Sequence, residues 1–208
     1  MMVNWKKKKE STLHSKTGRK AAEIVDSHQE SIRLHESILD ECYYCSYPYN
    51  LIRFHLPKDS IKWNNAVEYA FPEFKTRVHC VASTWIGKQI SLDRANQNER
   101  MLILDIGIGE AFEIECAPKI FFKEKSVVRN DLLFDTDLYL AWRKTCSDTI
   151  PEGQCCGFKV PLYLGGKYSV DNMEITDLEV YWHLFGQLFQ KTRNLADGTR
   201  VAVKGPEV

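Results

Sequence analysis

The chain has 208 residues, of which 44% are hydrophobic and 12% aromatic, and its formal net charge is zero. This length and composition predict one substantial hydrophobic core with an appended arm. The sequence contains no run of about 18 apolar residues, and its polar N-terminus lacks the apolar segment of a signal peptide. We therefore expect a cytoplasmic protein without a membrane-inserted segment.

The charge is unevenly distributed along the chain. Residues 1–20 contain seven Lys or Arg side chains and one acid, so residues 21–208 carry a net charge of −6. A mildly acidic body disfavours nucleic acid as its partner, although the lysines at 6–9 can touch phosphate or anionic lipid. We interpret residues 1–18 as a flexible basic N-terminus and residues 199–208 as a C-terminal tail.

The cysteine pattern argues against both a disulfide framework and a metal site. The chain has seven cysteines, an odd number, and the adjacent pair at 155–156 favours reduced thiols. Cys42 and Cys45 have CxxC spacing and follow two histidines, His28 and His35. Structural zinc sites use a histidine pair three to five residues apart or a second CxxC, and the chain has neither. The sequence therefore predicts no metal and no other cofactor.

The N-terminal part of the chain is expected to form a helix followed by an aromatic arm. Apolar residues recur at helical spacing over residues 19–41, and residues 42–57 contain four tyrosines around Pro48. Tyrosines at this density either pack over the surface of the protein body or present a surface to a partner. The second alternative is considered because tyrosine is enriched at protein interfaces. We interpret residues 19–56 as one N-terminal helix and arm. The candidate partner-binding residues are Tyr43, Tyr44, Tyr47 and Tyr49.

The middle of the chain is rich in predicted strands. A short helix around Trp63, capped by Asp59 and Ser60, is expected to end before Pro72. Alternating apolar residues then predict two hairpins. Their strands span residues 77–83 and 85–93, and then residues 101–106 and 111–115, with Gly107 and Gly109 in the second turn. Residues 131–145 are expected to form a helix with a buried apolar stripe.

The C-terminal part predicts a strand, a glycine turn and an amphipathic helix. Residues 158–164 alternate as a half-buried edge strand does, and Gly165 and Gly166 end that run. Thr176 and Glu179 have capping-box spacing, which predicts that a helix begins there.

The helix carries an apolar stripe that we assign to the core. The stripe consists of Leu178, Tyr181, Trp182, Phe185, Leu188 and Phe189. His183 lies off the stripe and is expected at the surface, and Gly186 is expected to allow close approach to the sheet. The order of all these elements indicates an α+β fold, in which helices pack on a twisted, mainly antiparallel sheet.

Residues 104–109, with the sequence LDIGIG, resemble the first motif of S-adenosylmethionine-dependent methyltransferases. In that motif a strand ends in an acidic residue, and a glycine loop approaches the cofactor, so an enzyme of this kind would use Asp105 to Gly109. Ala111 replaces the third glycine, and residues 111–115 alternate like a strand where that fold needs a helix. We keep this enzyme class as the alternative hypothesis.

Five segments together resemble the SUKH-type immunity proteins, specifically a subgroup found near type VI secretion toxins. These segments are residues 81–93, 104–110, 154–166, 177–182 and 186–188. They lie within residues 57–198, which we interpret as a SUKH-like α+β domain. The resemblance implies that the glycines before Glu110 close a β-turn, in agreement with the predicted hairpin.

The resemblance implies a module that binds and blocks a cognate protein toxin and catalyses no reaction. Related members include fungal cell-wall regulators that act as interaction modules. The sequence has no nucleophile elbow, HExxH motif or P-loop, which supports a non-catalytic protein. We therefore expect a protein toxin as the partner and no small-molecule substrate. An interface of ordinary size leaves no sequence motif, so the toxin and most contact residues are not predicted.

Overall fold

The computed structural model describes residues 5–7, 21–42, 51–96, 100–123, 131–146, 149–196, 198, 199 and 201. A six-stranded antiparallel sheet has the order β1 (Trp5–Lys7), β6 (Glu110–Ile114), β5 (Met101–Asp105), β4 (Gln89–Asp93), β3 (Val78–Thr84) and β2 (Ile52–Phe54). A separate two-stranded antiparallel sheet consists of β7 (Gln154–Phe158) and β8 (Met173–Asp177).

Helices surround the larger sheet, and the predicted α+β class is confirmed. They are α1 (Ala21–Cys42), α2 (Ser60–Ala70), α3 (Pro118–Lys123), α5 (Asp131–Phe134), α6 (Thr136–Thr145) and α7 (Leu178–Thr192). Short 3-10 turns are η2 (Pro57–Asp59), η3 (Pro72–Phe74), η4 (Arg94–Asn96), η5 (Leu162–Leu164) and η6 (Val170–Asn172). Among the described residues, no helix has both the length and the apolar character needed to cross a membrane.

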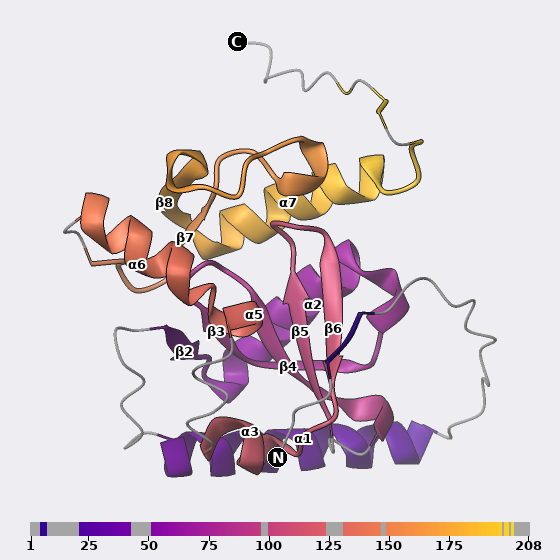
Figure 1. The fold of residues 1–208 in the computed structure, drawn as a ribbon. Coiled ribbons are helices and arrows are strands. Elements are labelled where there is room, and N and C mark those ends of the chain that lie inside the picture. Colours follow the sequence, from indigo (N-terminus) through magenta and orange to yellow (C-terminus); the bar gives the residue numbers. More distant parts are fainter. Residues whose placement is uncertain are drawn as a thin grey trace.

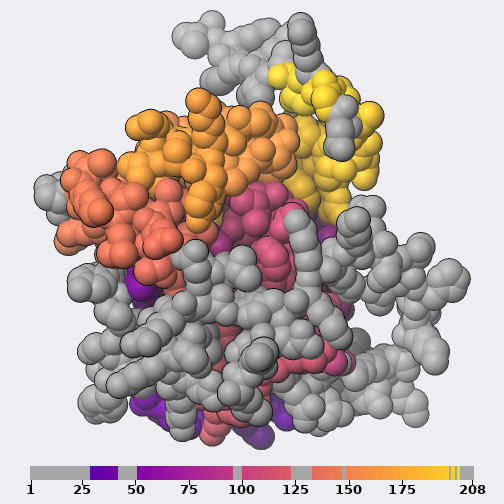
Figure 2. Space-filling view, in the orientation of Figure 1, coloured from indigo at the N-terminus to yellow at the C-terminus, as the bar shows by residue number. Residues whose placement is uncertain are grey.

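The elements form three levels along the strand direction. Helices α1 and α3 lie at one end of the six-stranded sheet, and β7, β8 and α7 lie at the other end (Figure 1). Helix α2 packs against β3 and against α7, so it joins the sheet to the C-terminal elements. In the space-filling view, residues 154–192 form a continuous layer over that end of the molecule (Figure 2). We call residues 154–192 the C-terminal lobe.

The central strands are buried on both faces. Every residue of β3, β4 and β5 is buried, including polar ones such as His79 and Gln89. The sequence predicted both hairpins, and the β3–β4 and β5–β6 pairings confirm them. The β3–β4 register shifts between Cys80 and Ala82, a bulge that leaves the Val81 carbonyl to accept a bond from the His55 amide.

The two edge strands of the six-stranded sheet, β1 and β2, lie outside the predicted SUKH-like segment. Residues 1–18 were expected to be flexible, but Trp5–Lys7 forms the edge strand β1 and pairs with β6. Strand β2 pairs with β3 at the opposite edge. Residues from the predicted N-terminal tail and arm therefore complete the same sheet as residues 57–198.

The helix predicted over residues 131–145 is broken. Helix α5 ends at Phe134, and α6 begins at Thr136. Asp135 between them has a φ of 48°, which a non-glycine residue adopts rarely and which stops the helical hydrogen-bond ladder. The predicted buried stripe is nevertheless present, since Leu133, Leu138 and Trp142 are all buried.

The predicted strand over residues 158–164 is wrong beyond its first residue. Strand β7 ends at Phe158, and residues 162–164 form a 3-10 turn. The Asn172 side chain bonds both the amide and the carbonyl of Val160, at 3.0 and 2.8 Å, and so takes the place of a neighbouring strand. Alternation of apolar residues could not distinguish this arrangement from a strand.

The start of α7 also differs from the prediction. Thr176 was expected to be the N-cap, but it lies in β8, a strand that the sequence did not predict. Asp177 is the N-cap instead, and its carboxylate accepts bonds from the amides of Glu179 and Val180, each at 2.9 Å. The cap therefore lies one residue later than expected, which leaves Thr176 free to pair with Cys155.

The apolar stripe of α7 is confirmed as core. Trp182 is 1% exposed and donates from its indole nitrogen to the Gly87 carbonyl at 2.7 Å. His183 is exposed, as expected. Gly186 was expected to approach the sheet, but the atoms nearest to it belong to Ala70 and Tyr69 of α2. A Cβ atom on Gly186 would meet Ala70 at 3.4 Å, an ordinary contact, so the packing of α7 on α2 does not require a glycine here.

Candidate functional site

The candidate partner-binding tyrosines lie outside the described residues. Tyr43, Tyr44, Tyr47 and Tyr49 follow the last residue of α1 and precede β2. Their predicted role in partner binding therefore stays a prediction. Cys45 also lies outside the described residues.

The loop that resembles a methyltransferase motif is the turn of an antiparallel hairpin. Gly107 lies between β5 and β6, and the next element is a strand, not a helix. The Asp105 carboxylate accepts bonds from the amides of Gly107 and Ile108, at 2.9 and 3.3 Å. Asp105 therefore closes the turn in which it lies, and the strand–loop–helix arrangement of a nucleotide-binding motif is not formed here.

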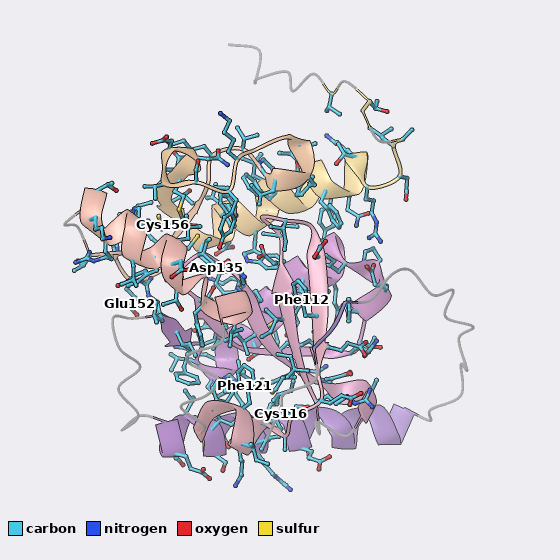
Figure 3. The ribbon with its side chains drawn as sticks, in the orientation of Figure 1. Phe112, Cys116, Phe121, Asp135, Glu152 and Cys156 are labelled. Atoms are coloured by element: carbon cyan, nitrogen blue, oxygen red, sulfur yellow. The ribbon has the colours of Figure 1, made fainter. Side chains whose placement is uncertain are left out.

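Asp105 also belongs to a buried ion cluster, which we call the Lys88 triad. The Lys88 ammonium lies 3.4 Å from a carboxylate oxygen of Asp105 and 2.7 Å from one of Asp135. Burial raises the pKa of Asp105 and the Lys88 charge opposes that rise, whereas the pKa of Lys88 is raised because the two carboxylates outweigh its burial. Tyr168 donates to the other oxygen of Asp135 at 2.7 Å. Figure 3 shows Asp135 next to the C-terminal lobe.

The position of Asp135 explains the broken helix. Its left-handed backbone conformation lies directly before α6, where its carboxylate reaches both Lys88 and Tyr168. The triad therefore joins three segments that are distant in sequence: the β3–β4 turn, the end of β5 and the α5–α6 junction. We interpret this cluster as structural, because every one of its charges has a partner within it.

A ring of glycines encloses Tyr181 at the same end of the sheet. A Cβ atom on Gly157 would lie 2.5 Å from the Tyr181 ring, and one on Gly107 would lie 2.6 Å from its hydroxyl. Gly87 is also close to this ring, with a corresponding distance of 3.1 Å. Gly107 of the apparent cofactor motif therefore makes room for the Tyr181 hydroxyl, whereas the other motif glycine, Gly109, lies against the Phe189 ring.

A second buried polar cluster lies at the opposite end of β3, and we call it the His35 cluster. His35 of α1 donates from Nε2 to the His55 carbonyl at 2.9 Å, so its Nδ1 is available as an acceptor. His79 Nε2 lies 3.3 Å from that Nδ1, and Arg94 lies 3.0 Å from His79 Nδ1. One set of neutral tautomers satisfies all three contacts, with Arg94 donating to His79 and His79 donating to His35.

Burial keeps His35 and His55 neutral. The pKa of His35 is lowered to about 4 by burial, and the pKa of His55 is lowered to about 4 for the same reason. His55 stacks on Trp63 at 4.9 Å and bonds the Gln89 side chain at 2.8 Å. These histidines attach α1 to the sheet and to α2. They are 20 or more positions apart in the chain, so no local pattern predicts that they meet.

The described cysteines and acids offer no site for a metal. Cys80, Cys146, Cys155 and Cys156 carry free thiols. Burial raises the pKa of Cys80 and Cys155, so neither thiol is activated as a nucleophile. Among the described residues, no group of three or more His, Cys, Asp or Glu side chains is arranged to hold a metal ion.

The surface is hollowed along α2, on the side that faces α7. A hollow of about 720 Å³ lies between the two helices and includes Ile61, Tyr69 and His183. A second hollow, of about 470 Å³, shares Asn65 and Tyr69 with the first. A third, of about 550 Å³, shares Lys62 and Trp63 with the first and extends to Glu152, which is labelled in Figure 3. We call these three neighbouring hollows, which share lining residues, the α2–α7 groove.

The α2–α7 groove contains residues that the sequence did not identify. Its two helices are more than 100 positions apart, so no local spacing brings them together. Val180 and Leu184 fall outside the core stripe of α7 and are 57% and 49% exposed, but they line none of the three hollows.

Comparisons with known proteins give one family and one solved structure. Residues 120–189, about a third of the chain, match the family described as "T6SS immunity protein Tdi1, C-terminal". No curated protein matches the chain significantly. The crystal structure of Atu4351 from Agrobacterium tumefaciens is similar, with a TM-score of 0.49 and 17% sequence identity over 81% of each chain. The family match confirms the predicted resemblance to SUKH-like immunity proteins of the type VI secretion subgroup.

Proposed function

From the match of residues 120–189 to the C-terminal family of the T6SS immunity protein Tdi1, we propose that this protein neutralises a cognate toxin by binding it directly. The match is the observation that carries the proposal. The partner is a protein toxin, and the complex forms in the cytoplasm of the cell that makes both proteins. The protein performs no catalysis.

The buried chemistry of the molecule supports a non-catalytic role. Asp105, the residue on which the methyltransferase alternative depends, bonds its own turn and lies beside Lys88. His35 and His79 bond each other, and burial raises the pKa of Cys80 and Cys155. These groups stabilise the fold in which they lie, so they are not available to a substrate.

The charge of the body supports steering of a basic partner. Residues 21–208 carry a net charge of −6. On α1, the exposed acids Glu30, Glu36 and Asp40 outnumber the exposed Arg33. An acidic surface accelerates encounter with a basic protein over a range of about 10 Å at moderate salt. We propose that these charges raise the association rate, and that Tyr43, Tyr44, Tyr47 and Tyr49 add contacts in the complex.

Co-expression with the toxin gene beside this gene tests the proposal. Cells that express the toxin alone are expected to stop growing, and cells that also express this protein are expected to grow. The purified proteins are expected to elute together on size exclusion, and toxin recovered from the complex is expected to have an unchanged mass. If growth is not restored and no complex elutes, direct neutralisation is wrong. A changed toxin mass would instead reveal an enzymatic activity.

A further inference from the structure

We propose that the hollow of about 550 Å³ beside β2 binds a guanidinium group, which an arginine side chain of the cognate toxin supplies. We call this part of the α2–α7 groove the β2 hollow. The inference rests on the proposed function, because it names a contact through which the toxin is held. It goes further than that function by assigning one ligand chemistry to a defined site, which includes neither the α1 acids nor the candidate tyrosines.

Two buried side chains line the β2 hollow with polar atoms that lack a partner. His55 and Ser83 are 8% and 2% exposed, and both line the hollow. His55 donates from Nε2 to the Gln89 side chain at 2.8 Å, so its Nδ1 carries a lone pair that can accept a bond. Within the part of the chain that the structure describes, neither His55 Nδ1 nor Ser83 Oγ makes a hydrogen bond. Buried polar atoms are rarely left unbonded, so a ligand that donates to both atoms is favoured here.

Two carboxylates at the β2 hollow are unpaired as well. Asp59 directly precedes α2, but its side chain makes no capping bond to that helix. Glu152, which is labelled in Figure 3, lies in the turn before β7. Among the described residues, neither carboxylate forms an ion pair or a hydrogen bond. The unbonded groups of the hollow can therefore all accept hydrogen bonds, which favours a ligand that is rich in donors.

The two cations of the β2 hollow are engaged with other groups. Arg53 donates to three backbone carbonyls of residues 150–154, at 2.5–2.9 Å. Lys62 pairs with Glu179 at 2.9 Å. With Glu179 included, two positive and three negative charges lie at the hollow, so its local charge is −1. This charge favours a cationic ligand over an anionic one.

A guanidinium group fits these acceptors better than an ammonium group does. Its five N–H donors lie in one plane and point in different directions, so they reach several acceptors at once. The bonds of Arg53 hold residues 150–154 against β2, so this wall of the hollow is formed before a ligand arrives and costs little to order. Arginine is also enriched among the residues that dominate protein–protein binding. The β2 hollow is therefore suited to an arginine of a basic toxin.

Titration of the full chain with a small probe tests the site without the toxin. The probe is Nα-acetyl-arginine amide, and Nα-acetyl-citrulline amide is the matched control, because it has a similar shape but no charge. We expect millimolar arginine probe to shift the amide NMR signals of residues 53–55 and 152–154, and the citrulline probe to leave them unchanged. We expect the double variant Ser83→Ala, Glu152→Gln to lose this response.

The same double variant tests whether the toxin supplies the arginine. The probe is a catalytically inactivated form of the toxin encoded beside this gene. Glu174→Gln is the control, because it removes one negative charge at an exposed residue outside the β2 hollow. We expect the double variant to lose roughly 10-fold or more in affinity by calorimetry and the control less than about threefold. Circular dichroism and thermal unfolding verify that both proteins fold.

Each alternative result has a distinct meaning. If the arginine probe shifts no signal of the hollow, or the citrulline probe shifts the same signals equally, the guanidinium site is wrong. If the toxin binds the folded double variant as tightly as the parent protein, the arginine does not come from the toxin, so the inference is overturned and the proposed function stands. If the toxin does not bind the parent protein, both proposals are wrong.

Discussion

The Lys88 triad and the His35 cluster lie at opposite ends of β3 and β4, and both attach other elements to the central sheet. The triad is charged and joins the α5–α6 junction to two strand ends through ion pairs of 2.7 and 3.4 Å. The His35 cluster holds α1 through the hydrogen bonds of His35, whose imidazole burial keeps neutral. A buried titratable side chain therefore stays charged where opposite charges lie beside it, as Lys88 does between two carboxylates, and is kept neutral by its burial otherwise, as His35 is.

The difference predicts opposite responses to pH. The pKa of Lys88 is raised in the folded state, so its contribution is complete at neutral pH and is lost only in strong alkali. The folded-state pKa of His35 is lowered from 6.5 to about 4, so its contribution is lost as the pH falls. Acid therefore weakens the attachment of α1, whereas strong alkali weakens the ion pairs of Lys88.

The largest expected effect is that of Lys88→Met. Removing the ammonium leaves Asp105 and Asp135 buried together without a cation, which we expect to cost about 3–5 kcal/mol of unfolding free energy. Urea denaturation at pH 7 measures this loss. Lys62→Met is the control, because Lys62 pairs with Glu179 where both side chains are about half exposed, and such pairs contribute about 0–1 kcal/mol. A loss below about 1 kcal/mol for Lys88→Met would contradict the structural role of the triad.

Acid is expected to have an effect of comparable size. Between pH 6.5 and 4, His35 and His55 bind protons in the unfolded chain but stay unprotonated in the folded protein. One histidine with this shift reduces stability by about 3 kcal/mol at pH 4. Denaturation curves over this pH range measure the loss. His35→Gln cannot take up a proton at position 35, so we expect it to be less stable at neutral pH but to lose less on acidification. An equal loss in both proteins would show that other groups control acid stability.

The sequence predicted the elements whose signals are local. The two hairpins and the apolar stripe of α7 follow from spacing within a few residues, and the structure confirms them. The break at Asp135 and the 3-10 turn after Phe158 were missed, since each depends on a distant partner. Lys88 provides that partner for Asp135, and Asn172 provides it for Val160. Side-chain bonds between distant segments leave no periodic pattern.

The candidate site was harder to predict than the fold. The α2–α7 groove exists only because residues more than 100 positions apart pack together, and Gly186 of α7 lies against Ala70 and Tyr69 of α2. The sequence indicated that Gly186 allowed a close approach, but it could not identify the neighbour. The tyrosine-rich segment gave a clear compositional signal, but composition alone does not distinguish a paved surface from a partner surface.

The smallest expected effect is that of Gly157→Ala. This substitution tests whether packing around Tyr181, in addition to the Lys88 ion pairs, attaches the C-terminal lobe to the sheet. A methyl group on Gly157 would lie 2.5 Å from the buried Tyr181 ring, so Gly157→Ala is expected to cost about 1–3 kcal/mol through overpacking. Gly186→Ala is the matched control, because its methyl group would meet Ala70 at 3.4 Å, an ordinary contact, and alanine favours a helix interior by about 1 kcal/mol. We therefore expect Gly186→Ala to leave stability unchanged or to raise it slightly, as measured by urea denaturation. If Gly157→Ala were harmless, the lobe would be able to shift around Tyr181, and the Lys88 triad would be the main attachment at this end of the sheet.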